Sequence, residues 1–195
     1  MGDARSEILG RIRSAIGESA GPAFPVSTYR RHGSLSPSER TALFCERIAD
    51  YRATVHRTGD VLGAVRQVVS GRIGVSPAFP EVWRPSGVEL VDAAALSPAE
   101  LDRLDGVLTG CRLAIAETGT IVLVGDRAMT LVPDLHVCVV RSEQIVETVP
   151  EAIELLAREQ RALTLVSGPS ATSDIELSRV EGVHGPRRLV AIVCA

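Results

Sequence analysis

Hydrophobic positions in the first half of the chain form short β-type runs that alternate with helical patterns. Helices are predicted from the capping box at residues 36–39 and from Asp60. Strands are predicted over 53–57, 72–75 and 88–91. Strands that alternate with helices in this way form a parallel sheet with both faces covered.

The hydrophobic period changes in the second half. The runs 113–116, 120–124 and 135–140 are β-rich, and the tight turn at 117–119 predicts neighbouring antiparallel strands. A further helix is predicted over 150–159. The predicted fold class is therefore α/β: a three-layer, open, mixed but mainly parallel sheet with helices on both faces.

The N-terminal segment has a helical pattern of its own. Asp3 can cap a helix that Gly17 ends, and residues 18–36 are rich in Gly, Pro and Ser. We predict an N-terminal helix and linker arm over 1–36 and one α/β domain over 37–195. A single helix cannot bury its own stripe, so it is expected to dock on this domain or on a partner chain. The stripe consists of Ile8, Leu9, Ile12 and Ile16.

A stretch of twenty residues, 167–186, separates the apolar runs 163–166 and 189–193. A connection of this length inside a domain is typically functional. It combines hydroxyls, carboxylates, an Arg and a His, a density typical of a site for a small anionic ligand. His184 is a candidate for proton transfer. The candidate ligand-binding residues are Gly168, Ser170, Thr172, Ser173, Asp174, Arg179 and Glu181.

Simpler interpretations of this stretch stay open. Ser173 and Asp174 can cap a short helix, and Arg179 can form an ordinary ion pair with Glu176 or Glu181.

The turn at 117–120 is the second candidate site. Glu117 can act as a base, a nucleophile or a ligand anchor, or it can be a solvated hairpin residue. Gly119 allows a tight turn or a close approach to a ligand, and Thr118 and Thr120 supply hydroxyls. Because strand 163–166 is expected in the same sheet, 117–120 and 167–186 are predicted to form one ligand site.

His136 begins an apolar strand and has two interpretations. It is either a structural histidine or a ligand-binding residue. In the second interpretation it lies at the same edge of the sheet as Glu117, because the two strands are predicted to be neighbours. A metal site from His136, His184 and nearby carboxylates is a further alternative. The spacing matches no metal motif, so no metal is predicted.

Composition excludes several classes of function. The net charge is -3 and aromatics are 3%, which disfavour nucleic-acid binding. The chain has no Lys, which excludes Schiff-base and P-loop chemistry. Cysteines at 45, 111, 138 and 194 lack the spacing of a cluster or zinc motif, and Cys111 and Cys138 are expected to be buried thiols. No signal peptide or membrane span is predicted, so the chain is expected to be cytoplasmic.

Three motifs, at 117–120, 131–136 and 167–186, look like signatures of the lactate utilisation protein C family. They occur in the same order as in that family. The chain resembles this branch of the lactate-utilisation domain proteins closely over about 111–193. The resemblance implies a fold like that of ribose-phosphate isomerase, glucosamine-phosphate deaminase and CoA-transferase. It also implies L-lactate oxidation to pyruvate together with an A-type, cysteine-rich protein and a B-type, iron–sulfur protein.

Lactate oxidation removes two electrons and needs a redox centre. No cofactor is predicted in this chain, and iron–sulfur clusters are expected in the partner subunits. The chain is then a non-redox subunit that binds a small anionic ligand, and a homo-oligomer stays open. The alternative is a stand-alone isomerase- or CoA-transferase-like enzyme that uses Glu117. A third option is a regulatory ligand sensor.

Overall fold

The computed structural model describes residues 4–17, 29–125, 127–174, 178–181 and 185–194, with the backbone alone over 171–174 and 178–181. A six-stranded sheet forms the centre, and every neighbouring pair in it is parallel. Its strands, in spatial order, are β1 (Thr54–Arg57), β12 (Arg188–Cys194), β7 (Leu135–Arg141), β4 (Gly106–Gly110), β2 (Arg72–Val75) and β3 (Glu89–Asp92).

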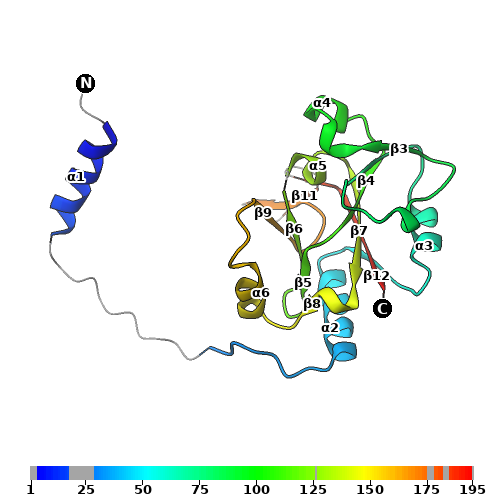
Figure 1. Ribbon diagram of the computed structural model, residues 1–195, viewed down its shortest axis with the longest axis horizontal. Coiled ribbons are helices and arrows are strands. Elements are labelled where there is room, and N and C mark those ends of the chain that lie inside the picture. The colour runs from blue at the N-terminus through cyan, green and yellow to red at the C-terminus, as the bar shows by residue number, and fades with distance from the viewer. Residues whose placement is uncertain (1–3, 18–28, 126, 175–177, 182–184, 195) are drawn as a thin grey trace.

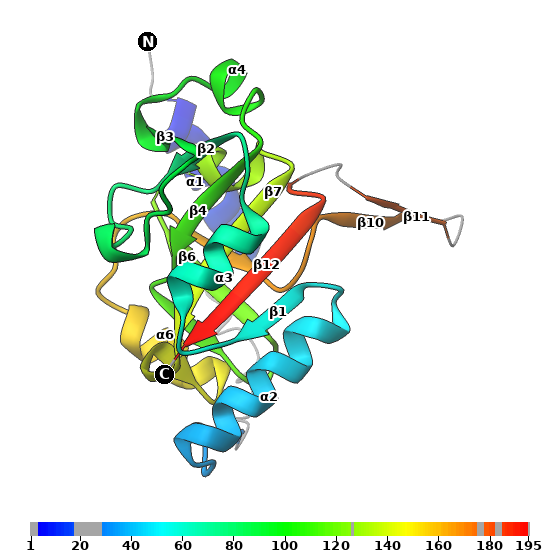
Figure 2. The same ribbon diagram turned by 90° about the vertical axis from the view of Figure 1, so that its right-hand side faces the viewer.

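A second sheet of four strands lies beside the first one (Figure 1). Its β5–β6 and β6–β9 pairs are antiparallel, while β8 runs parallel to β5. A separate two-stranded hairpin projects from the body (Figure 2). The strands are, in spatial order, β8 (Ile145–Val146), β5 (Leu113–Ile115), β6 (Thr120–Val124) and β9 (Leu163–Val166), and in the hairpin β10 (Ala171–Asp174) and β11 (Ser178–Glu181).

Helices lie on the outer faces of both sheets. In Figure 1, α3 lies on one side of the six-stranded sheet, the second sheet lies on the other, and α6 lies outside the second sheet. The helices are α1 (Ala4–Ile16), α2 (Pro37–Asp50), α3 (Val61–Val68), α4 (Pro98–Leu101), α5 (Ala128–Leu131) and α6 (Val149–Leu156). Three 3-10 turns are η1 (Glu81–Trp83), η2 (Ala93–Ala95) and η3 (Ser142–Gln144).

Three of the four apolar clusters in the described part of the chain hold these layers together. One lies between the two sheets, where Phe44 and Ile48 of α2 meet residues of β5, β6, β7 and β12. A second cluster joins α3 to the other face of the central sheet, and a third joins α6 to the second sheet. Each buried Leu, Ile or Phe contributes roughly 1.5–3 kcal/mol, so this aliphatic core is sufficient without many aromatics.

Local sequence fixes the helix starts, as expected for α2 and α3. Ser36 and Glu39 form a capping box at α2, and Asp60 accepts a hydrogen bond from the Gly63 N–H at α3. Thr148 and Glu151 form another capping box at α6. Each such cap contributes about 1 kcal/mol.

The predicted fold class is confirmed, with one correction. The strands at 113–115, 120–124 and 163–166 do not extend the central sheet; together with β8 they form the second one. Strands 113–124 and 135–140 are therefore not neighbours in a single sheet, and the prediction that places His136 beside Glu117 on that ground is wrong. The predicted helix over 4–16 is confirmed, and all its described residues are exposed. Its docking surface stays a prediction.

Two further expectations change. The stretch 167–186 contains the β10–β11 hairpin, so the short helix capped by Ser173 and Asp174 is wrong. Strand β4 was not predicted, because Gly106 and Gly110 shorten its apolar run to two residues, Val107 and Leu108.

Candidate functional site

The central sheet reverses its winding between β2 and β4, and we call this position the switch point. From β2 the chain moves outward to β3, whereas from β4 it moves the other way to β7. Loops after two such strands leave on opposite faces of the sheet and open a crevice between them. In open α/β sheets, ligands bind in this crevice, at the carboxyl ends of the strands.

A cavity of about 220 Å³ lies at this position. Its walls come from the carboxyl ends of β2 and β4 on one side and from β6, β9 and α5 on the other. This volume suits a molecule of a few heavy atoms. The polar residues that line the cavity are Ser76, Thr109, Arg112, Thr130, Arg161 and Thr164.

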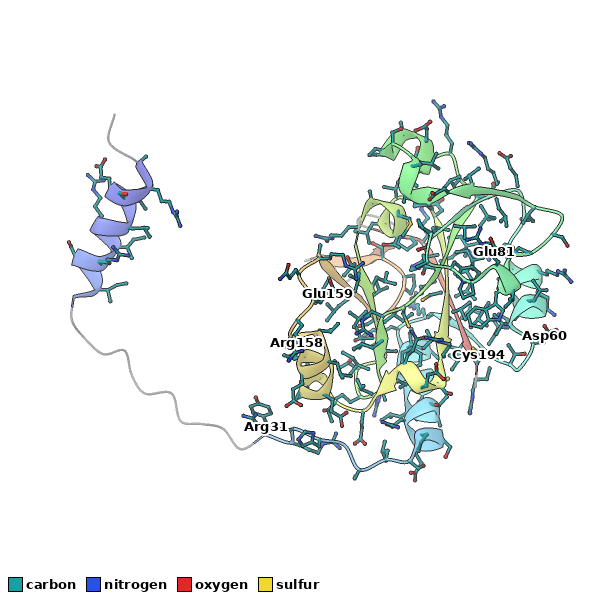
Figure 3. The ribbon with its side chains drawn as sticks, in the orientation of Figure 1. Arg31, Asp60, Glu81, Arg158, Glu159 and Cys194 are labelled. Atoms are coloured by element: carbon teal, nitrogen blue, oxygen red, sulfur yellow. The ribbon has the colours of Figure 1, made fainter. Side chains whose placement is uncertain are left out.

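Two arginines from different elements line the cavity. Arg112 follows β4 and is exposed, and Arg161 precedes β9. Arg161 also binds Glu159 in an ion pair of 2.9 Å, and this contact holds the pKa of Glu159 at about 2. Figure 3 shows Glu159 in the connection between α6 and β9. Guanidinium groups bind carboxylates and phosphates through two parallel hydrogen bonds.

Thr109 links the cavity to His136. Thr109 is 2% exposed and its Oγ1 lies 2.8 Å from Nε2 of His136 in a hydrogen bond. His136 is fully buried in β7, and its Nδ1 has no hydrogen-bond partner among the described residues. Burial lowers the pKa of His136 to about 4, so the ring is neutral at pH 7. This candidate residue therefore lies behind the cavity wall rather than beside Glu117.

Cys111 lines the same cavity but is not poised as a nucleophile. A hydrogen bond with Cys138 and burial raise the pKa of the Cys111 thiol well above its ordinary value. A reactive cysteine needs the opposite shift. Cys138 is buried, as expected, and Cys111 is partly buried.

A second cavity, of about 400 Å³, also lies at the carboxyl ends of the central strands, but beside β1 and β12 instead of β2 and β4. Arg57 and Thr58 after β1, Cys194 of β12 and the start of α2 line it. Cys194 is labelled in Figure 3. This cavity adjoins the edge strand β1 and not the switch point.

The structure brings the turn at 117–120 and the start of the 167–186 stretch together. Thr120 Oγ1 lies 2.7 Å from Thr118 Oγ1 and 2.8 Å from Ser167 Oγ, and both pairs are hydrogen-bonded. The two segments adjoin because β6 and β9 are antiparallel neighbours, with Ile121 opposite Val166. Their predicted proximity is confirmed.

The glycines at this turn approach the helix α2. A Cβ on Gly119, whose φ is +58°, would lie 2.6 Å from the carbonyl carbon of Arg47. A Cβ on Gly168 would lie 2.7 Å from the carbonyl oxygen of Tyr51. A side chain at either position would collide with the backbone of α2. Close packing against this helix therefore accounts for both glycines, and no ligand is needed to explain them.

The turn and the switch-point cavity lie at opposite ends of β6. Thr120 begins the strand next to the turn, while Leu123, Val124 and Gly125 line the cavity. The two ends of this five-residue strand lie roughly 13 Å apart, at about 3.3 Å per residue. The rule about carboxyl ends holds for parallel strands. Because β6 is antiparallel to both β5 and β9, the rule indicates the cavity in the central sheet and not the turn.

Glu117 is engaged by structural contacts. Its Oε1 accepts a hydrogen bond of 2.8 Å from the Val149 N–H at the start of α6, and its Oε2 pairs with Arg30 at 3.2 Å. Arg30 also forms an ion pair with Glu147. Glu117 therefore helps to fix the segment before α2, which we name the N-terminal strap (residues 29–36).

Two more carboxylates hold the strap. Glu147 is 2% exposed and accepts a hydrogen bond of 2.7 Å from the Leu35 N–H, and Glu151 accepts one of 3.0 Å from the Gly33 N–H. The Leu35 N–H, followed by Arg30, holds the pKa of Glu147 below its ordinary value, although burial acts in the opposite direction. Glu117, Glu147 and Glu151 together form the acidic clamp. The pattern in the sequence gives no sign of it, because the hydrogen-bonded pairs are 87–118 residues apart along the chain.

The remaining candidates lie in the hairpin. Gly168 and Ser170 precede β10, and the Ser170 N–H donates to the Pro186 carbonyl at 2.8 Å. Thr172, Ser173, Asp174, Arg179 and Glu181 have a described backbone only, and His184 lies outside the described residues. A ligand role for these residues stays a prediction.

Two general findings concern the described part of the chain. In it, no group of three or more His, Cys, Asp or Glu side chains is arranged to hold a metal ion. None of its helices has the length and hydrophobicity that crossing a membrane requires.

Comparisons with known proteins agree with the resemblance in the sequence. The LUD domain family matches residues 98–194. The "Lactate utilization protein C" of Deinococcus radiodurans is 47% identical, with 98% of this chain and 95% of the relative covered. The uncharacterized protein YkgG of Escherichia coli is 26% identical over 98% of both chains.

A solved structure shares the fold. The crystal structure of a DUF162 family protein from Deinococcus radiodurans superposes with a TM-score of 0.71 at 40% identity. The superposition covers 83% of this chain and all of the other one.

Proposed function

The chain belongs to the lactate utilisation protein C branch of the LUD domain family, and on that premise we propose that it is a non-redox subunit of an iron–sulfur-dependent system that oxidises L-lactate to pyruvate. Relatives of this branch support a role in lactate utilisation. The finer assignment adds two parts: the electrons pass to partner subunits, and this chain binds a small anionic ligand.

The spacing of the cysteines supports the first part. Lactate oxidation releases two electrons, which iron–sulfur clusters can accept. Clusters need thiolates bunched on short turns, and the four cysteines stand at 45, 111, 138 and 194. A cysteine-rich A-type protein and an iron–sulfur B-type protein are the proposed partners.

One observation carries the second part: a cavity at the switch point is lined by two guanidinium groups, Arg112 and Arg161. Arg161 already shares its charge with Glu159, so Arg112 supplies the main attraction for an anion. The volume of about 220 Å³ fits a small carboxylate such as lactate or pyruvate.

His136 sets the direction of the Thr109 hydroxyl. A buried N–H without a partner is rare in proteins, so the unpaired Nδ1 is best left unprotonated. The proton then lies on Nε2, which donates to Thr109 Oγ1. Thr109 in turn donates its O–H into the cavity, toward the carboxylate of the ligand. His136 is thus a positioning residue.

The test is a calorimetric titration with lactate, pyruvate and phosphate. Arg112→Gln removes a charged hydrogen bond worth roughly 1.5–3 kcal/mol, so the Kd should rise about 10- to 100-fold. Arg57→Gln is the matched control, because Arg57 lines the second cavity. Unchanged binding in Arg112→Gln, or weaker binding in Arg57→Gln alone, would contradict the assignment.

The role among subunits needs a separate test. Lactate-dependent reduction of an artificial electron acceptor should require this chain together with both partner proteins. Full activity of the partners without this chain would contradict the proposal.

The stand-alone enzyme that uses Glu117 is the less supported alternative. The Glu117 carboxylate binds the Val149 N–H and Arg30, so both of its oxygens are already engaged. A base or nucleophile in a free enzyme needs one oxygen open to the substrate.

A further inference from the structure

The apolar stripe of α1 has no cover in the described part of the chain. All residues of this helix are exposed, and no cluster of the core includes them. An isolated helix of 13 residues is marginal in water, so its stability has to come from packing. The stripe and its exposed fractions are Ile8 58%, Leu9 37%, Ile12 47% and Ile16 63%.

The outer face of the second sheet is only partly covered. Leu165 stands opposite Val122, whose side chain belongs to the cluster under α6. Leu163 and Leu165 point to the same face, because alternate residues of a strand share one side. Leu165 is nevertheless 60% exposed, so α6 does not reach over β9.

The widths of the sheet and of a helix also show that α6 covers only part of this face. Four strands spaced about 4.8 Å apart make a face roughly 19 Å wide, while one helix is about 10 Å across. Leu155 of α6 lines a groove with Val146 of β8, so it lies on the β8 side of this helix. Ile153, on the opposite flank, is 63% exposed on the β9 side. A strip about one helix wide is left bare beside α6.

The chain itself can supply the missing helix. The acidic clamp fixes the strap next to the start of α6. Between Ile16 and Arg30, thirteen residues can span up to about 43–47 Å, which is longer than the roughly 20 Å of α1. The tether keeps the effective concentration of α1 in the millimolar range.

We propose that α1 docks over β9 beside α6 of the same chain, with its apolar stripe on Ile153, Leu163 and Leu165. The second sheet then carries two helices on its outer face. The strap acts as the hinge that directs the arm there.

The test is a mutant cycle between the two surfaces. Ile12→Asp and Leu165→Asp should each lower the thermal midpoint by about 2–4 °C, and the double variant should fall no further than the larger single effect. Val82→Asp is the control, because Val82 is 74% exposed in η1, outside this patch. Additive effects of the two substitutions would overturn the proposal, as would single variants that melt like the control.

Hydrogen exchange and light scattering distinguish docking of α1 within one chain from docking of a second copy. For the full chain, slow exchange of α1 amides in a monomer, lost in Leu165→Asp, is the expected result. A dimer that dissociates on the same substitution would assign the strip to a second copy and overturn the intramolecular contact. Fast exchange of α1 amides at all concentrations would overturn it as well.

Discussion

Replacing Glu147 by Gln tests how the strap is held. Gln keeps the size of the side chain but removes the charge that attracts the Leu35 N–H and Arg30. A hydrogen bond to a charged acceptor contributes roughly 1.5–3 kcal/mol, and Glu147 is 2% exposed, so little solvent compensates for its loss. We expect the free energy of unfolding to fall by about 2 kcal/mol, which lowers the thermal midpoint by roughly 4–8 °C.

The control is Glu143→Gln, four residues earlier. Glu143 is 69% exposed and pairs with Arg141 at the surface, a contact that contributes about 0–1 kcal/mol. Differential scanning calorimetry at pH 7 should separate the two variants clearly. Equal midpoints would refute the inference that the buried carboxylate anchors the strap.

The same pair has a defined pH dependence. Folding lowers the pKa of Glu147 below its ordinary value of 4.5, so its contribution is fully present above pH 4.5. The contribution is lost as the pH falls through the folded pKa. The difference in midpoint between the wild type and Glu147→Gln should therefore shrink below pH 4.5. A difference that grows on acidification would contradict the sign of the shift.

Three further predictions follow from the structure. Gly33→Ala places a Cβ in contact with the Glu147 side chain, so it should loosen the strap and speed its proteolysis, whereas Gly59→Ala, with nothing within 4 Å, should leave the rate unchanged. Thr109→Val should weaken carboxylate binding in calorimetry by roughly 1–2 kcal/mol, and it should also lower the midpoint because the buried Nε2 of His136 loses its hydrogen-bond partner; Arg179→Ala should leave the binding unaltered, and the reverse would place the ligand at the hairpin. The isolated protein should be colourless and inactive toward lactate, and visible absorbance from a stoichiometric cluster or flavin would refute its non-redox role.

Most elements of the fold are predictable from local sequence. Capping boxes and β-rich runs fix the starts of α2, α3 and α6 and the positions of most strands. The exception that matters is β4, because its apolar run of Val107 and Leu108 is too short to stand out between two glycines. Without β4 the switch point cannot be located, and the cavity that it helps to line is missed.

The site required information that only the tertiary structure holds. The turn at 117–120 meets Ser167 as predicted, since antiparallel neighbours bring their ends together. The sequence alone suggests that Gly119 and Gly168 approach a ligand, because it does not show that α2 packs against both of them. His136 can be recognised in the sequence as a titratable residue in a strand. Its hydrogen bond to Thr109, however, depends on the pairing between β4 and β7.

A crystal structure of the chain grown with pyruvate tests the central claim most directly. We predict that the pyruvate carboxylate lies in the cavity at the switch point, within hydrogen-bond distance of the Arg112 guanidinium and Thr109 Oγ1. Crystals of Arg112→Gln grown in the same way should show the cavity without pyruvate. Pyruvate bound instead between the turn at 117–120 and the start of the hairpin, with the cavity empty in both proteins, would contradict the account.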